Sequence, residues 1–287
     1  IGELLPIDKI VGALPVAHGA LAVDQIAAAA RGIMTTDTRP KMVSRQVVVE
    51  GHQVTISGIA KGSGMIKPNM ATMLSYIFTD ARLTQSTLDR LLREQVARSF
   101  NRITVDGDTS TNDCCLLSAT GYSAAPVEAE SGQCHTVFEE ALADVFRELA
   151  VELIKDAEGA TKFVTVAVTG GLNSRECLQV GYAVAESPLV KTALFASDPN
   201  WGRILAAIGR AGLDNLDINA VEVWLGNTRI VENGCRDAHY TEAAGQAEMD
   251  KNEITISISL ARGDVSEKIF TADLSYDYVR INADYRS

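Results

Sequence analysis

The feature that most constrains the fold is a loop containing glycine and proline that joins two runs of β-type sequence. Residues 47–58 carry Glu50-Gly51 between two apolar runs and predict a hairpin. Residues 73–79, MLSYIFT, predict a buried strand. The loop at 61–72 reads KGSGMIKPNMAT, and glycines and a proline of this kind allow unusual dihedrals and a close approach to other backbone. A hairpin and a strand joined by such a loop are therefore expected.

Thr72 ends this loop and stands directly before the predicted strand. A threonine hydroxyl is a weak nucleophile unless a base lies beside it. Cleavage of the Ala71–Thr72 bond would free the α-amine of Thr72, and an α-amine has a pKa of about 8. Part of that amine is unprotonated at neutral pH and could act as the base. A connecting loop without catalytic function is the alternative interpretation.

Helical and strand patterns alternate irregularly along the rest of the chain. Apolar residues at helical or strand spacing predict helices at 18–33, 136–155 and 174–186, and strands at 163–169 and 254–260. Residues 1–15 contain two prolines and predict a loop with a short helical turn. We therefore expect an α/β protein built of α+β layers, with helices on mixed or antiparallel sheets rather than a doubly wound parallel sheet.

Charge and cysteine usage exclude several classes of function. The 287 residues carry a net charge of −11, which argues against a nucleic-acid partner. The five cysteines form no CxxC pair, so neither a disulfide framework nor a zinc site is expected. Residues 106–113 resemble half of a calcium loop but lack its glycine and closing glutamate, so we expect no metal. No apolar run is long enough for a bilayer, and no signal peptide is visible, so we expect no membrane contact and a cytoplasmic location.

The run KGSGMI at 61–66, followed by PNMATML at 68–74, resembles the self-cleavage segment of the ornithine acetyltransferases, the bifunctional glutamate N-acetyltransferases. This resemblance implies that the precursor cuts itself between Ala71 and Thr72. The products would be an α chain, whose C-terminal part is residues 1–71, and a β chain of residues 72–287, which begins with the nucleophile Thr72. It also implies a fold outside the main N-terminal-nucleophile hydrolase class that uses the same chemistry.

The same resemblance assigns substrate-binding residues. It implies Thr35, with Thr36 as the near alternative, in the TTDT segment, and Lys61 and Thr72 in the cleavage segment. It further implies Glu158, in the EGATK loop, whose carboxylate suits an amino group by a charge-assisted hydrogen bond. At the C-terminus it implies that Asn282 and Ser287 reach into the pocket. Residues 106–113 are expected to brace the surroundings of Thr72 through hydrogen bonds.

The implied activity is acetyl transfer from N2-acetyl-L-ornithine to L-glutamate through an acetyl-threonine, a ping-pong reaction of arginine biosynthesis. Two alternatives stay open from the residues: an N-terminal-threonine amidase or aminopeptidase with water as acceptor, and a non-enzymatic scaffold. No cofactor is expected, although acetyl-CoA remains an alternative acetyl donor. The resemblance implies an α2β2 heterotetramer. It also places the Thr-Gly pair of the oxyanion hole in an N-terminal segment upstream of Ile1.

Overall fold

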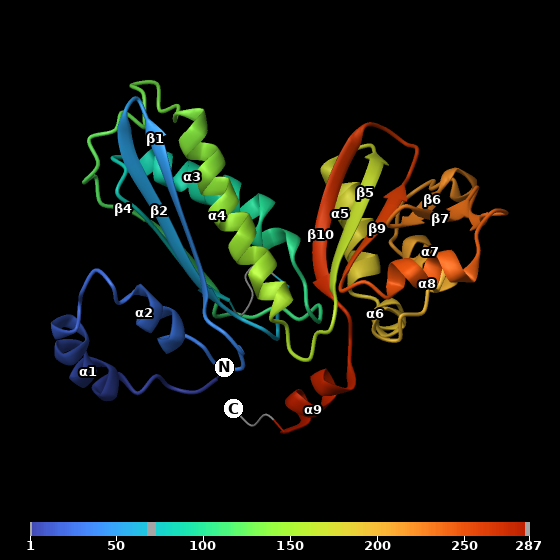
Figure 1. Ribbon diagram of the computed structural model, residues 1–287, viewed down its shortest axis with the longest axis horizontal. Coiled ribbons are helices and arrows are strands. Elements are labelled where there is room, and N and C mark those ends of the chain that lie inside the picture. Colours follow the sequence, from blue (N-terminus) through green and yellow to red (C-terminus); the bar gives the residue numbers. More distant parts are fainter. Residues whose placement is uncertain (1, 68–72, 285–287) are drawn as a thin grey trace.

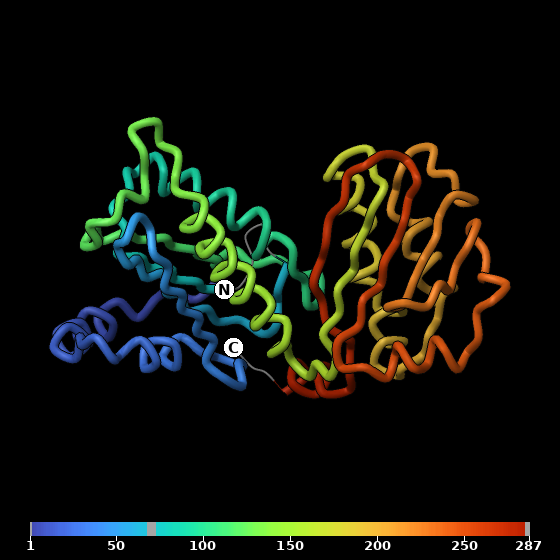
Figure 2. The backbone as a smooth tube through the Cα atoms, turned by 45° about the horizontal axis from the view of Figure 1, so that its top comes forward, coloured from blue at the N-terminus to red at the C-terminus, as the bar shows by residue number. Residues whose placement is uncertain are grey.

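The computed structural model describes residues 2–67 and 73–284; residues 1, 68–72 and 285–287 lie outside the described residues. The described residues form two sheets, and each sheet belongs to its own half of the molecule (Figure 1). The first half is built from the blue and green part of the chain and the second from the yellow to red part, as the turned view also shows (Figure 2). Each half has its own cluster of buried apolar side chains.

The first sheet has the strand order β1-β2-β3-β4. Its strands are β1 (Lys41–Val49), β2 (His52–Lys61), β3 (Leu74–Thr79) and β4 (Cys114–Ala119). The predicted hairpin is confirmed: Glu50 and Gly51 have φ of 48° and 82°, the positive values that a two-residue turn of this kind requires. β1, β2 and β3 are antiparallel, whereas β3 and β4 are parallel. Leu74 pairs with both Lys61 and Cys114, so the ends of three strands lie side by side.

Two helices lie against the first sheet, α3 (Gln85–Arg98) and α4 (Thr136–Lys155): α3 contacts β4, and α4 packs on β1 and β2. Thr84 caps α3 by accepting a hydrogen bond from the Thr87 amide. The sequence predicted α4 with the bounds that the structure shows. Gly58 allows α4 to lie close to the sheet, because a Cβ at this position would be 2.7 Å from Leu149 Cδ1. A short 3-10 helix, Phe100–Arg102, follows α3.

The second sheet has the order β10-β5-β9-β6-β7-β8. Its strands are β5 (Phe163–Gly171), β6 (Glu222–Leu225), β7 (Thr228–Glu232), β8 (Cys235–Arg236), β9 (Glu253–Ser259) and β10 (Val265–Ala272). β5 and β9 are parallel, and the other pairs are antiparallel. Val164, Val166 and Val168 alternate inward along β5, the pattern of a strand with one buried face. Both sheets are mixed, as the irregular order of elements predicted.

The helices of the second half are α5 (Ser174–Ala185), α6 (Pro188–Phe195), α7 (Trp201–Gly209) and α8 (Glu242–Met249), with a 3-10 turn at Ile218–Ala220. α5 packs on β5 and β10, while α8 packs on β6 and β7. After β10, the last helix α9 (Tyr276–Asp284) turns back toward the first half and brings the C-terminal part of the chain close to it (Figure 1).

The N-terminal prediction was wrong in detail. Instead of a loop and one long helix, the chain forms α1 (Ile7–Gly19) and a shorter α2 (Ile26–Gly32). Pro6 precedes the first turn of α1, where a backbone N–H has no acceptor within the helix, so the N–H that proline lacks is not needed there. The helix then continues through Pro15 to Gly19. Residues 20–25 interrupt the helical pattern with turns. α1 has no buried residue, so tertiary packing within the described chain does not select its conformation.

Among the described ranges, no helix combines the length and the apolar character that a bilayer crossing requires.

Candidate functional site

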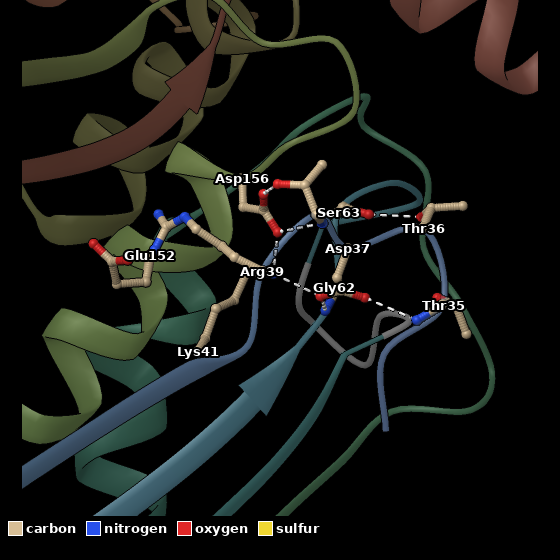
Figure 3. A network of polar contacts seen from close by, with 10 residues as sticks. Thr35, Thr36, Asp37, Arg39, Lys41, Gly62, Ser63, Glu152 and Asp156 are labelled. Carbon is tan, nitrogen blue, oxygen red and sulfur yellow. Dashed lines mark hydrogen bonds and ion pairs between the residues drawn. The ribbon is translucent and has the colours of Figure 1, made fainter. Parts of the chain in front are cut away.

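Three buried charged side chains tie the start of β1 to the end of α4. Lys41 Nζ lies 2.6 Å from Asp37 Oδ1 and 2.5 Å from Asp156 Oδ2, and Figure 3 shows the dashed contacts among these residues. We call Lys41, Asp37 and Asp156 the Lys41 cluster. The side chains of Lys41 and Asp37 are fully buried, and that of Asp156 is 3% exposed. A charge without solvent is stable only when it is paired, so these three side chains hold one another in place.

Asp37 also fixes two neighbouring loops through their backbone amides. It accepts hydrogen bonds from the Gly62 amide at 2.8 Å and the Thr35 amide at 3.1 Å. Burial by itself raises the pKa of the Asp37 carboxyl, but the hydrogen bonds from Lys41, Gly62 and Thr35 outweigh burial and hold the pKa below its ordinary value. The loop that carries Thr35 is thereby attached to the residue that follows Lys61.

The TTDT segment at 35–38 contacts the loop that begins at Lys61 through a pair of hydroxyl groups. Thr36 Oγ1 and Ser63 Oγ lie 2.6 Å apart (Figure 3). The Thr38 amide donates to Asp156 Oδ2 at 3.1 Å. Within the described part of the chain, the hydroxyl of Thr35 has no hydrogen bond, while its amide is held by Asp37. The Thr36 hydroxyl is thus already engaged by Ser63, and the choice of Thr35 rather than Thr36 as the ligand stays a prediction.

The strand ends beside the cleavage segment converge on Met73. Its amide donates to Asp113 Oδ1 at 2.6 Å, and its carbonyl accepts from the Cys114 amide at 3.1 Å. Lys61 ends β2 and pairs with Leu74, the residue after Met73. Burial raises the pKa of the Asp113 carboxyl to about 6, although the Met73 amide and the charge of Lys61 lower it. The carboxylate of Asp113 and the ammonium of Lys61 therefore both lie near Met73, the residue that directly follows Thr72.

Glu158 and Asn282 are brought together from distant parts of the sequence. Asn282 Nδ2 donates to Glu158 Oε2 at 2.7 Å, so α9 reaches the loop after α4. The Glu158 amide in turn donates to the Ser63 carbonyl at 2.9 Å. Gly64 makes room for the carboxylate, because a Cβ there would lie 2.3 Å from Glu158 Oε2. The predicted residues Thr35, Lys61, Glu158 and Asn282 thus lie on loops and element ends that contact one another.

Asp106 and Tyr278 connect the same elements, and the sequence did not indicate their pairing. Asp106 accepts hydrogen bonds from the amides of Met65 and Ile66 at 2.7 and 3.1 Å. Tyr278, on α9, donates its hydroxyl to Asp106 Oδ2 at 3.1 Å. Burial and the negative charge of Asp106 raise the pKa of the Tyr278 hydroxyl, which stays protonated as a donor. The polar run at 106–113 therefore contacts the loop that begins at Lys61 at Met65 and Ile66, and it contacts Met73, the residue directly after that loop.

Three predicted site residues, Ala71, Thr72 and Ser287, lie outside the described residues. Within residues 2–67 and 73–284, no group of three or more His, Cys, Asp and Glu side chains is placed to hold a metal ion.

The fold and the site define a two-sheet α/β protein whose polar site lies where the loops after α4 and β2 meet the C-terminal helix. Comparison with known proteins gives the family. The ArgJ family model matches residues 1–287, and the chain belongs to this family.

Curated relatives match this chain over its full length. "Arginine biosynthesis bifunctional protein ArgJ" of Pseudomonas syringae pv. tomato is 58% identical over 288 residues, which cover 100% of this chain and 71% of the relative. The protein of the same name in Pseudomonas fluorescens is 56% identical with the same coverage. Among solved structures, the crystal structure of arginine biosynthesis bifunctional protein ArgJ from Bacillus halodurans has 36% identity and a TM-score of 0.70. That match covers 75% of this chain and 100% of the solved chain, and it confirms the mixed α/β architecture.

Proposed function

We propose that this protein is a glutamate N-acetyltransferase of the ornithine acetyltransferase type, which moves an acetyl group from N2-acetyl-L-ornithine to L-glutamate in arginine biosynthesis. Membership of the ArgJ family supports this reaction class. The observation that carries the proposal is the convergence of Glu158, Asn282 and the loop of Thr35 on the loop that begins at Lys61. These groups match the charges and polar atoms of an amino acid.

The first step proposed is self-cleavage between Ala71 and Thr72. The Thr72 hydroxyl attacks the Ala71 carbonyl carbon, the acyl group moves from nitrogen to oxygen, and the nitrogen takes up the proton to become the free amine. Water then hydrolyses the ester, which releases residues 1–71 with a new carboxylate and restores the hydroxyl. Support comes from membership of the ArgJ family and from the resemblance of residues 61–74 to the self-cleavage segment of the ornithine acetyltransferases.

Turnover uses the same hydroxyl in two half-reactions. Thr72 attacks the acetyl carbonyl of N2-acetylornithine, and its α-amine takes the hydroxyl proton and passes it to the departing amine of ornithine. The α-amine of glutamate then attacks the acetyl-threonine, and N-acetylglutamate leaves as the Thr72 hydroxyl is restored. Because threonine carries the acetyl group, this route needs no cofactor; acetyl-CoA would be an alternative donor to the same hydroxyl.

The amino-acid substrate is proposed to bind through Thr35, Lys61, Glu158, Asn282 and Ser287. Lys61 supplies a positive charge to the substrate carboxylate, and Glu158 accepts a charge-assisted hydrogen bond from an amino group. The Glu158–Asn282 hydrogen bond orients the carboxylate before substrate arrives. Fixed polar groups of this kind favour a productive orientation. The two chains are further proposed to assemble as α2β2 in the cytoplasm.

The acceptor distinguishes this proposal from hydrolysis. We expect the protein, incubated with N2-acetylornithine and glutamate, to form N-acetylglutamate and ornithine in equal amounts. Without glutamate, turnover should stop once each active site holds one acetyl group. Quantifying both products by mass spectrometry with and without glutamate tests this. Free acetate produced at a rate that does not depend on glutamate would identify an amidase instead.

Gly64→Ala should weaken substrate binding without unfolding the protein. A Cβ at this position would displace the Glu158 carboxylate, which is the far end of a flexible side chain and can move. Loss of one charge-assisted hydrogen bond is expected to raise the KM for N2-acetylornithine about tenfold or more. Gly209→Ala is the matched control, because a Cβ at Gly209 meets nothing within 4 Å. Steady-state kinetics and thermal unfolding of both variants check the prediction, and an unchanged KM for Gly64→Ala would contradict it.

A further inference from the structure

The described residues on either side of segment 68–72 are anchored, and their anchors differ. On the upstream side, Lys67 Nζ forms an ion pair with Glu186 Oε2 at 2.9 Å and lies 5.5 Å from the centre of the Tyr182 ring. Both partners belong to the second half, since Tyr182 is on α5 and Glu186 directly follows the last residue of α5. Lys67 is therefore held by a different half of the molecule from the one that carries β2 and β3.

The surroundings of Glu186 and Tyr182 favour a positive charge at the position of Lys67. The side chain of Glu186 is 20% exposed, and its Oε1 is buried without a hydrogen-bond partner among the described residues. The Tyr182 hydroxyl donates to the Asn101 carbonyl at 3.0 Å, which fixes the ring under the ammonium. A partly desolvated carboxylate and an aromatic face both favour a cation at the position of Lys67.

The downstream anchor holds the backbone of Met73. Asp113 accepts the Met73 amide at 2.6 Å, and the Cys114 amide donates to the Met73 carbonyl at 3.1 Å. Met73 is 3% exposed, so its side chain is also enclosed. The nitrogen that Asp113 holds is bonded covalently to the carbonyl carbon of Thr72, so the carboxylate acts on the residue next to the nucleophile.

We propose that Lys67 and Asp113 are positioning residues with separate tasks: Lys67 serves the self-cleavage step alone, and Asp113 serves both self-cleavage and acetyl transfer. This inference rests on the proposed function. Before cleavage, the two anchors fix both ends of the segment in which the Thr72 hydroxyl must meet the Ala71 carbonyl. After cleavage, Lys67 belongs to the released end of the upstream chain and has no covalent route to Thr72. Asp113 still holds Met73, and through it the chain that carries the nucleophile.

The chain offers matched controls for both anchors. Lys155 forms an ion pair with Glu253 at 2.6 Å and lies 5.4 Å from the Phe163 ring centre, the same combination of partners as Lys67 but outside the site. Asp80 follows the far end of β3 and accepts the Thr55 amide at 2.8 Å, as Asp113 accepts the Met73 amide at the near end. Lys155→Met and Asp80→Asn therefore reproduce the chemical changes without touching residues 61–73.

The experiment compares Lys67→Met, Glu186→Gln, Asp113→Asn and Asp113→Ala with these controls. The conversion of the intact chain into two pieces is followed by denatured mass, and kcat and KM are then measured per mole of fully cleaved protein. We expect Lys67→Met and Glu186→Gln to cleave about tenfold more slowly, with wild-type kcat and KM once cleavage is complete. Asp113→Ala should lower both the cleavage rate and kcat by about tenfold or more, and Asp113→Asn, which keeps an acceptor oxygen, should restore part of each.

Three outcomes would overturn the inference. Wild-type cleavage in Lys67→Met and Glu186→Gln would remove the upstream task, and a lowered kcat in their mature forms would show that Lys67 is not confined to cleavage. An Asp113→Ala protein that cleaves slowly but turns over normally would remove the downstream task. Thermal unfolding of every variant identifies any loss that is due to misfolding, and Asp113→Asn, which keeps the side-chain shape, supplies the folded comparison. A wild-type protein that never cleaves would refute the proposed function itself, which is a different result from wild-type-like variants of a cleaving protein.

Discussion

Thr72→Ala is expected to leave the chain in one piece and to abolish acetyl transfer. The hydroxyl of Thr72 is the attacking group in self-cleavage and in both half-reactions, and alanine has no atom that can take over this role. Removal of a catalytic nucleophile lowers turnover by about 10⁴-fold or more. Denatured mass should show one intact species for the variant and two pieces for the wild type, with the N-terminus of the second piece at Thr72.

Thr72→Ser is the matched variant, because it keeps the hydroxyl and loses only the methyl group. We expect it to cleave and to transfer acetyl, more slowly than the wild type, since a serine hydroxyl rotates more freely than the β-branched threonine. An alanine variant that still separates into two pieces, or still forms N-acetylglutamate, would show that another residue is the nucleophile. A serine variant as inactive as alanine would show that the methyl group is required to orient the hydroxyl.

Local sequence patterns predicted the elements that have strong periodicity. The hairpin was predictable because Glu50-Gly51 supplies the two positive φ values of its turn. α4 was predictable because twenty residues repeat an apolar face, although the apolar Val137 is 40% exposed while the neighbouring Phe138 is fully buried. A face read from spacing alone can be rotated by one residue, because a helix in contact with a sheet buries a wide stripe of its surface.

Other elements could not be predicted from local patterns. α6 and α8 are helices of eight residues each, too short to show a repeat. α1 continues through Pro15, which local rules treat as a helix breaker. Short or irregular helices leave few periodic residues in the sequence, so only the three-dimensional structure shows them.

The candidate site likewise contains some residues that the sequence predicted and others that only the structure shows. The resemblance of the sequence to the ornithine acetyltransferases pointed to Glu158 and Asn282 as site residues. They lie 124 positions apart in the sequence, and the structure places them within hydrogen-bonding distance. The Lys41 cluster had no such signal, because Lys41 and Asp156 are 115 positions apart and each looks like an ordinary surface charge in its own segment. The TTDT motif did contain Asp37, but only the fold shows that this carboxylate serves Lys41 and the amides of Thr35 and Gly62.

The Lys41 cluster gives the largest expected effect on stability. Lys41→Met removes the only cation of the cluster and leaves the carboxylates of Asp37 and Asp156 buried in contact with an apolar side chain. Removal of one partner of a buried ion pair costs about 3–5 kcal/mol of unfolding free energy. Denaturant unfolding at pH 7 in the uncleaved Thr72→Ala background measures the effect on a single chain. Lys268→Met, on the exposed face of β10, should change the unfolding free energy by less than about 0.5 kcal/mol.

The pH dependence of this loss tests its electrostatic origin. In the wild type the pKa of Asp37 is lowered, so its contribution to stability is present above the unfolded pKa of about 3.9 and is lost as the pH falls. Without Lys41, burial and the neighbouring Asp156 raise the pKa of Asp37, and the ionised form then destabilises the folded state. The deficit of Lys41→Met should therefore be largest at pH 7 and shrink toward pH 5, and a further Asp156→Asn change should recover part of it. A deficit that is the same at both pH values would indicate that lost packing, rather than the unpaired carboxylates, causes the instability.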